Sequence, residues 1–216
     1  MNDFKVESHV ISLNKHGEEL CGDNVVTRKY GNDLVMVLSD GLGSGVKANI
    51  LATLSSTMIA TMIGRGIAFE EVMDIVMNTL PVCKERGLAY STFTVFYLRE
   101  EKYVTIMNYD NPLPVILRNG SPLSLDFRHV KISGRTMQTV SFTLETDDVL
   151  VSMSDGCIHA GQEKTLNKAW RRDNIMQYLR AMYVEDYSAR TIAELLIDEC
   201  EKLYNGKTLD DTTVLT

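Results

Sequence analysis

The sequence predicts an α+β protein with mostly antiparallel sheets, and three observations support this. Strand-like and helix-like runs are segregated along the chain, in the order strands, two helices, strands, two helices and a final strand. Short turn signals separate consecutive strand-like runs, which is typical of hairpins. The chain has 216 residues, 44% of them hydrophobic, and can bury the core of one domain. We therefore expect residues 1–216 to form a single domain.

The N-terminal part of the chain indicates strands. Residues 4–13 alternate roughly between apolar and polar, as a strand with one wet face does. Further on, residues 25–30 and the apolar run 34–39 are separated by a glycine-containing turn, which suggests a hairpin. Such a hairpin would set Asp23 near one of its ends. The spacing alone leaves open whether this is the end that carries Asp40.

Two consecutive helices are expected after this hairpin. The run 46–65 contains no proline, and four of its apolar residues recur at helical spacing. These four are Ile50, Leu54, Met58 and Met62. Residues 69–86 repeat the pattern and end before Gly87, a typical helix stop.

Strands return in the middle of the chain, and two more helices follow. Turn signals separate three strand-like runs, which indicates hairpins, and shorter strands come after them. The expected strands are 91–98, 102–109, 114–118, 127–132 and 140–144, and the expected helices are 162–182 and 188–204.

An acidic residue stands beside a buried strand at three places. The run 34–45 passes from an apolar strand into Asp40 and then into glycines that allow close approach of backbone and ligand. The run 148–156 repeats this pattern with Asp155, and Asp210 comes just before the last strand-like run. For any single Asp-Gly pair, an ordinary turn is the better explanation. The repetition favours one shared acidic site.

The three carboxylates have no cluster of histidines or thiolates near them in the sequence. Ligand sets of oxygen alone favour a hard cation such as Mg²⁺ or Mn²⁺. Without a cation, converging carboxylates repel one another and at least one takes up a proton. Two such ions can hold a bridging water, lower its pKa toward ~7 and clamp an in-line displacement at phosphorus. The residues therefore favour a shared metal site that is capable of such chemistry.

The composition excludes several classes of protein. The net charge of −7 results from 29 acidic and 22 basic residues without a basic stripe, so nucleic-acid binding has no electrostatic support. No apolar run approaches the ~18 residues of a membrane helix. The N-terminus lacks the features of a signal peptide, so we expect a cytoplasmic protein. The four cysteines form no Cys-x-x-Cys pair, and we expect neither a zinc site nor a disulfide framework.

The acidic motifs, taken in order, resemble those of the bacterial metal-dependent protein phosphatase family (PPM type), in particular its stage II sporulation protein E and sigma-regulatory group. The motifs are GD at 22–23, SDGLGSG at 39–45, SDG at 154–156 and DDTTVL at 210–215. The resemblance extends from Cys21 to the end of the chain. It implies a four-layer α-β-β-α sandwich, in which helix pairs flank two mostly antiparallel sheets and a metal site lies at one end of the sheets.

The resemblance also implies roles for individual residues. Two divalent ions, Mn²⁺ or Mg²⁺, would be bound, with Asp40 bridging both and the Gly41 carbonyl ligating one. Asp155 and Asp210 would complete the coordination of the other ion, and Asp23 would act through metal-bound water. Asp40 and Asp23 are the implied catalytic residues.

Two departures from the family pattern are visible. Leu42 stands where many eukaryotic members have a histidine that is a candidate general acid, and the sporulation type is similarly apolar there. The family's Gly-His-Asn-Pro turn is replaced by Tyr-Asp-Asn-Pro at 109–112. No ligand for a third metal is identified.

The resemblance implies a protein serine/threonine phosphatase with a signalling or sigma-factor-pathway role. It would hydrolyse phosphoserine or phosphothreonine by direct attack of a water activated by two divalent metals. Its partner would be a phosphorylated protein, an anti-sigma-factor antagonist in the resembled group. The alternative is a catalytically weak or inactive phosphoprotein-binding module of the same fold. An aspartyl-phosphate hydrolase is disfavoured, because position 42 is Leu where a second Asp is needed. The sequence leaves open whether the protein is a homodimer.

Overall fold

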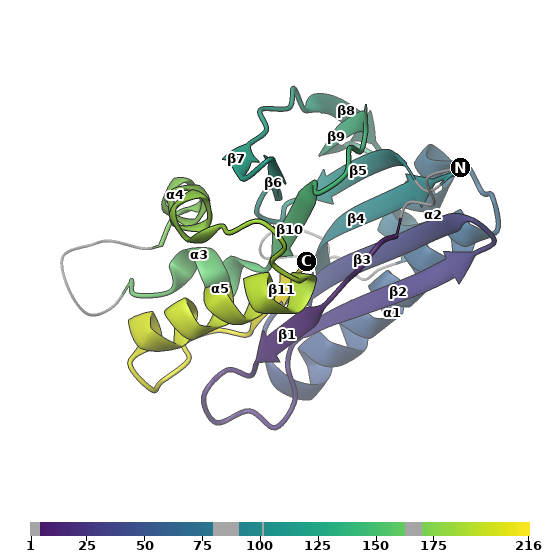
Figure 1. The fold of residues 1–216 in the computed structure, drawn as a ribbon. Helices are drawn as coiled ribbons and strands as arrows, with labels where there is room; N and C mark the ends of the chain where they lie inside the picture. The colour runs from purple at the N-terminus through teal and green to yellow at the C-terminus, as the bar shows by residue number, and fades with distance from the viewer. Residues whose placement is uncertain (1–4, 80–90, 101, 163–169) are drawn as a thin grey trace.

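The computed structural model of the chain describes residues 5–79, 91–100, 102–162 and 170–216. These residues form four layers, with two sheets facing each other between two outer layers of helices (Figure 1). The predicted α+β sandwich with mostly antiparallel sheets is therefore confirmed.

The first sheet has six strands in the order β2-β3-β4-β5-β9-β8, and every neighbouring pair is antiparallel. The expected hairpin near the N-terminus is its β2–β3 pair. The strands are β2 (Asp23–Tyr30), β3 (Asp33–Gly41), β4 (Ser91–Arg99), β5 (Tyr103–Tyr109), β8 (Arg128–Ile132) and β9 (Arg135–Thr143).

The second sheet has five strands in the order β1-β11-β10-β6-β7, again all antiparallel. They are β1 (Val10–Leu13), β6 (Val115–Arg118), β7 (Ser121–Pro122), β10 (Val149–Met153) and β11 (Thr212–Leu215). The strand expected over 4–13 is shorter, because only its last four residues pair with β11.

The expected hairpin between β5 and β6 is wrong. β5 belongs to the six-stranded sheet, whereas β6 pairs with β10 and β7 in the five-stranded sheet. Pro112 and Pro114 lie in the connection, and proline has no backbone N–H for a strand ladder. The segment 110–114 therefore carries the chain from one sheet to the other.

The helices are α1 (Gly45–Gly64), α2 (Phe69–Thr79), α3 (Asp155–His159), α4 (Arg172–Met182) and α5 (Ala189–Tyr204). The helices expected at 46–65 and 188–204 agree with α1 and α5 to within one residue. α2 agrees with the start of the helix expected at 69–86, whose end lies outside the described residues. The helix expected from 162 begins only at Arg172 within the described residues, and the short α3 was not expected.

Of the four apolar residues at helical spacing in α1, Met58 and Met62 pack, partly buried, against the core of the six-stranded sheet, whereas the other two are exposed. Ile50 and Leu54 are 59% and 43% exposed. The face toward the six-stranded sheet consists instead mainly of small residues, including Ala48 and Ala52, together with Ile59 and Ile63. Small side chains let the helix axis approach the sheet closely. By length and composition α1 would suffice to span a membrane, with a mean hydropathy of 1.3 over eighteen residues, but 39% of that window is buried in this fold.

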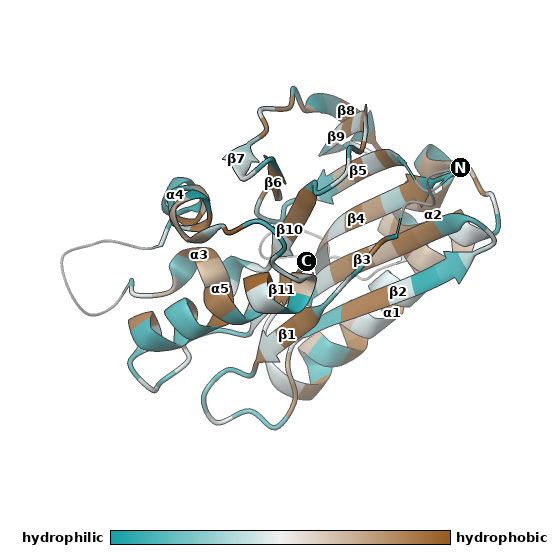
Figure 2. Cartoon of the chain, in the orientation of Figure 1, coloured by the Kyte–Doolittle hydropathy of each residue, from teal (hydrophilic) through white to brown (hydrophobic). Residues whose placement is uncertain are grey.

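Three apolar cores hold the layers together, and Figure 2 shows the hydrophobic colour concentrated on inner strands such as β3, β4 and β10. One core joins α1 and α2 to the six-stranded sheet, and a second joins α3, α4 and α5 to the five-stranded sheet. The third lies between the sheets and includes Met36, Leu38 and Leu215. Because alternate strand residues share a face, Asp40 continues the row of Met36 and Leu38. The layer between the sheets thus changes from apolar to acidic toward one end.

Candidate metal and phosphate site

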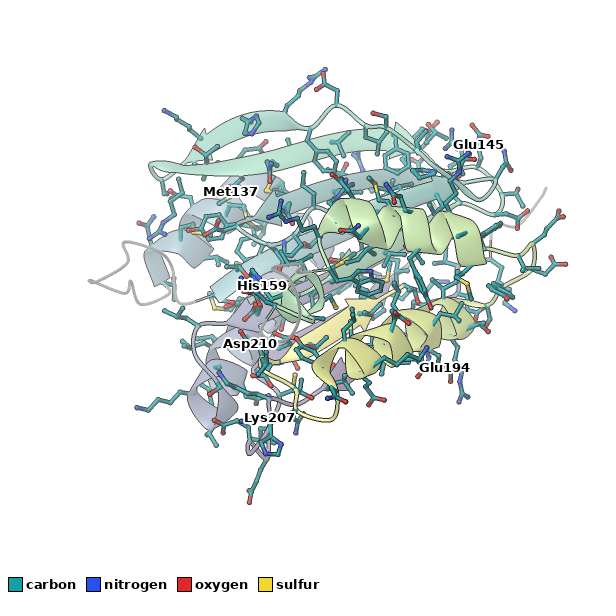
Figure 3. All side chains as sticks on the ribbon, turned by 90° about the vertical axis from the view of Figure 1, so that its left-hand side faces the viewer. Met137, Glu145, His159, Glu194, Lys207 and Asp210 are labelled. Carbon is teal, nitrogen blue, oxygen red and sulfur yellow. The ribbon has the colours of Figure 1, made fainter. Side chains whose placement is uncertain are left out.

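Four aspartates from the two sheets lie at this end of the sandwich. Asp23 is directly opposite Asp40 in the β2–β3 ladder, which answers the question of register that the sequence left open. Asp155 is the first residue of α3, directly after β10, and Asp210 precedes β11, the neighbour of β10. Figure 3 shows Asp210 and His159 toward the same side of the molecule, whereas Glu145 lies toward the opposite side.

The glycines of the motifs are required by close packing. A Cβ atom on Gly41 would lie 2.0 Å from the backbone oxygen of Ala48 in the first turn of α1. A Cβ atom on Gly156 would lie 2.2 Å from the backbone oxygen of Asp211. Each glycine therefore lets the segment that carries one acidic residue pack directly against another part of the site.

Asp23 is the most deeply buried of the four, with 5% of its surface exposed. Neither of its carboxylate oxygens has a hydrogen-bond partner. The nearby hydroxyls donate elsewhere, that of Ser154 to the Asp211 carbonyl and that of Thr213 to Ser12. Burial raises the pKa of Asp23 to about 7, and the nearby hydroxyls of Ser154 and Thr213 lower it only in part. The net desolvation thus favours a proton, or another positive charge, at this carboxylate.

The other carboxylates act on one another. Burial raises the pKa of Asp40 well above its usual range, and the charges of Asp23, Asp155 and Asp210 add to this. Burial and the Asp155 charge also raise the pKa of Asp210, whereas Lys15, with Nζ 3.8 Å from Asp210 Oδ1, lowers it. The four groups are therefore close enough to disfavour simultaneous ionisation.

Asp211 has a structural contact that the sequence did not indicate. Its Oδ1 accepts a hydrogen bond of 3.0 Å from the backbone N–H of Lys15, while its Oδ2 is buried without a partner. Its own N–H donates to Asp210 Oδ1 at 3.1 Å. Asp211 thus fixes the loop after β1 beside Asp210.

The donor chemistry fits divalent cations. Within the described part of the chain, no three His, Cys, Asp or Glu side chains are already arranged to hold one ion. The buried oxygens of Asp23 and Asp211 without partners, and the mutual repulsion around Asp40, are what a hard cation would relieve. Burial and the Asp23 charge raise the pKa of the nearby Cys21 thiol to about 12, so this thiol is protonated in the metal-free protein.

Beside the acidic cluster, a buried amide network crosses between the sheets, and sequence reasoning gave it no role. Asn111 Nδ2 donates to Thr94 Oγ1 in β4 at 2.8 Å and to the carbonyl oxygen of Met153 in β10 at 3.1 Å. Thr94 donates to Asn108 Oδ1 at 2.6 Å, and Asn108 Nδ2 donates to the carbonyl of Asn111 at 2.6 Å. The only sequence signal was the Asn-Pro pair in the turn after β5.

The four-layer arrangement, with aspartates at one end of two facing sheets, is the fold of PP2C domains. Residues 30–216 match the family model described as Stage II sporulation protein E (SpoIIE), and the chain belongs to this family. The resemblance drawn from the acidic motifs is therefore confirmed. No protein with a curated description matches the chain significantly in sequence.

Solved structures show the same fold at low sequence identity. The PP2C phosphatase domain of SpoIIE from Bacillus subtilis, with a fragment of its regulatory domain, has a TM-score of 0.80 at 17% identity and is matched over 100% of this chain and 63% of that chain. The phosphatase domain of the same protein, in a crystal form without domain swapping, has a TM-score of 0.71 at 18% identity. The match covers 98% of this chain and 90% of that chain. The structure of RsbX in complex with magnesium has a TM-score of 0.64 at 18% identity. The match covers 96% of this chain and 92% of that chain. The chain thus spans less than two thirds of the first of these structures.

Proposed function

We propose that the chain is a metal-dependent protein serine/threonine phosphatase, with residues 1–216 as one catalytic domain. The observation that carries the proposal is the pairing of Asp23 with Asp40 in a buried position where neither Asp23 oxygen has a hydrogen-bond partner. A buried carboxylate without a partner costs stability. Its presence at the end of a family-typical motif favours a ligand role over a structural one.

The residues that would hold two divalent ions are Asp40, Asp155, Asp210 and the Gly41 carbonyl, with Asp23 acting through a water. When bound, such ions supply an activated water nucleophile and neutralise the charge that develops on the phosphoryl group. Asp40 is close enough to the other three carboxylates for their charges to raise its pKa, and it is the proposed shared ligand. Magnesium in the RsbX structure supports the choice of a hard cation, Mg²⁺ or Mn²⁺.

The protein itself contributes the positions of these ligands. Asp23 and Asp40 are fixed by the β2–β3 ladder, and Gly41 is pressed against α1. Leu42 has no proton to transfer, so this chain offers no side chain at that position for protonating the leaving group. Because the carboxylates of this set are assigned to the ions, the proposed reaction is direct attack of a water on phosphorus, without a phosphorylated enzyme intermediate.

We further propose a phosphorylated protein as substrate and a cytoplasmic signalling role. The structural neighbours include a bacterial stressosome component and the RsbU and RsbW domains of a Mycobacterium tuberculosis protein, which supports a sigma-factor pathway. An anti-sigma-factor antagonist phosphorylated on serine is the candidate substrate. A binding module without turnover is the second hypothesis, but it would have no reason to keep the costly Asp23–Asp40 pair.

Hydrolysis of an aryl phosphate and of a phosphoserine peptide tests the proposal. Activity should require Mn²⁺ or Mg²⁺ and disappear in chelator. Asp40→Asn should lower turnover by several orders of magnitude, whereas Asp198→Asn, at an exposed position of α5, should leave it unchanged. Full activity of metal-stripped protein would refute the metal mechanism. Binding of a phosphoprotein without turnover, at any divalent ion concentration, would establish the binding module instead.

A further inference from the structure

Each of the two sheets carries only half of the acidic cluster. Asp23 and Asp40 belong to the six-stranded sheet, whereas Asp155 and Asp210 flank strands of the five-stranded sheet. The distance between the two halves therefore depends on how the sheets are placed relative to each other at this end. Apolar contacts between the sheets are not directional and do not fix such a distance by themselves.

One side chain makes directional contacts with both sheets close to the cluster. Asn111 lies in the connection that crosses between the sheets, and its Nδ2 donates to Thr94 Oγ1 in β4 and to the Met153 carbonyl in β10. Thr94 is two residues from Thr92, the partner of Asp40 in the ladder. Met153 is two residues before Asp155. A single amide group thus connects the strands that present the two halves of the cluster.

The surroundings of Asn111 are buried. Thr94 and Asn108 are 0% and 1% exposed, and Asn111 itself is 7% exposed. Asn108 Oδ1 accepts a hydrogen bond from the Thr94 hydroxyl, and Asn108 Nδ2 donates one to the backbone carbonyl of Asn111. The Asn111 Oδ1 atom is buried without a partner. An asparagine that only stabilised its own turn would not need to leave a buried acceptor unpaired. The two hydrogen bonds that Nδ2 donates, one to each sheet, are therefore the distinguishing feature of Asn111.

We propose that Asn111 is a positioning residue that sets the spacing between Asp40 and Asp155 and thereby the affinity of the site for its divalent ions. The proposal rests on the proposed metal-dependent function. Loss of the Nδ2 contacts would let the sheets separate or slide at this end while the apolar part of the inter-sheet core farther from the cluster, around Phe96 and Leu98, stays in place. Metal binding would weaken, and chemistry at saturating metal would be affected much less.

Titration calorimetry of the metal-stripped full chain with Mn²⁺ is the main measurement. Asn111→Leu keeps the side-chain volume and removes the donors, and Thr94→Val removes the acceptor on β4. Both should raise the Kd of the weaker ion at least tenfold. Thr94→Ser keeps the hydroxyl and should stay within twofold of wild type. In steady-state assays the metal concentration for half-maximal activity should rise in the same variants, with kcat at saturating metal within about threefold.

Leu98→Ala provides the matched control, because Leu98 is 2% exposed in the same inter-sheet core but at the other end. It should lower the midpoint of thermal unfolding as much as Asn111→Leu does and leave the Kd for Mn²⁺ unchanged. Unchanged metal affinity in both folded Asn111→Leu and Thr94→Val would overturn the positioning role. If Asn111→Leu does not fold, the difference in Kd for Mn²⁺ between Thr94→Val and Thr94→Ser still tests the positioning role. Absence of Mn²⁺ binding by the wild type would instead refute the proposed function itself.

Discussion

Replacing Asp23 by Asn should stabilise the metal-free protein at neutral and alkaline pH. The carboxyl pKa is raised by burial from 3.8 to about 7. Because the folded state holds the proton more tightly than the unfolded state, the stability associated with protonated Asp23 is complete below about pH 4. It is lost as pH rises toward 7, at about 1.4 kcal/mol per pH unit. Ionised Asp23 therefore costs up to about 4 kcal/mol at pH 8.

An asparagine at this position has nearly the same shape and no charge to bury. Its amide would still lack donors and acceptors, since both oxygens of Asp23 lack them, and this retains about 1 to 3 kcal/mol of desolvation cost. Removal of the charge also relieves Asp40, whose raised pKa owes part of its shift to Asp23. We expect a net gain of about 1 to 3 kcal/mol in the free energy of unfolding at pH 8. The gain should shrink toward pH 5.

Urea denaturation of metal-free wild type and Asp23→Asn, at several pH values between 5 and 8.5, measures this difference directly. The same series with saturating Mn²⁺ should reverse the order, because a ligand that binds only the folded state stabilises the protein that binds it better. Asp198→Asn serves as the control for a change of charge alone. A difference between wild type and variant that does not vary with pH, or a variant that is less stable at pH 8, would refute the reasoning.

Three further predictions follow from the same geometry. Saturating Mn²⁺ should raise the midpoint of thermal unfolding of the wild type by about 5 °C or more, as expected for ligand at about 100 times its Kd, and no shift would contradict binding at this site. Gly156→Ala should destabilise the fold by about 1 to 3 kcal/mol, because its Cβ would lie 2.2 Å from the Asp211 carbonyl; chemical denaturation measures this. Met73→Leu, a volume-conserving change in the core between α1 and α2, should shift the Mn²⁺ concentration for half-maximal activity more than twofold, since α1 contacts Gly41. An unchanged value would leave α2 a packing role alone.

Local patterns were sufficient to predict most of the elements. The β2–β3 hairpin, α1 and α5 follow from turn residues and periodicity, which depend on neighbours in the sequence. The place of β6 could not be predicted in this way, because its partners β10 and β7 are chosen by pairing across the fold. The apolar spacing did not show which face of α1 is buried: Ile50 and Leu54 are exposed, and small residues face the sheet together with Ile59 and Ile63. How closely a helix packs on a sheet depends on both surfaces. The periodicity of apolar residues in the helix alone therefore does not predict which of its faces is buried.

The site was predictable as a set of residues and less so as an arrangement. The motifs named Asp23, Asp40, Asp155 and Asp210 before any contact was known, and the structure brings them to one end of the sandwich. The register that places Asp23 opposite Asp40 is known only from the pairing of β2 with β3 in the structure. The inter-sheet contacts of Asn111 were invisible, because both partners come from strands distant in the sequence.

The stability of this fold and its proposed activity are opposed at the same residues. A domain of this size is held by a net free energy of only about 5 to 15 kcal/mol. Ionised Asp23 alone offsets a substantial part of that, and repulsion among Asp40, Asp155 and Asp210 adds to it. Divalent ions would remove the repulsion and draw the two sheets together at this end. Metal binding and the placement of the sheets are then one equilibrium, in which any contact that changes the distance between Asp40 and Asp155 also changes metal affinity.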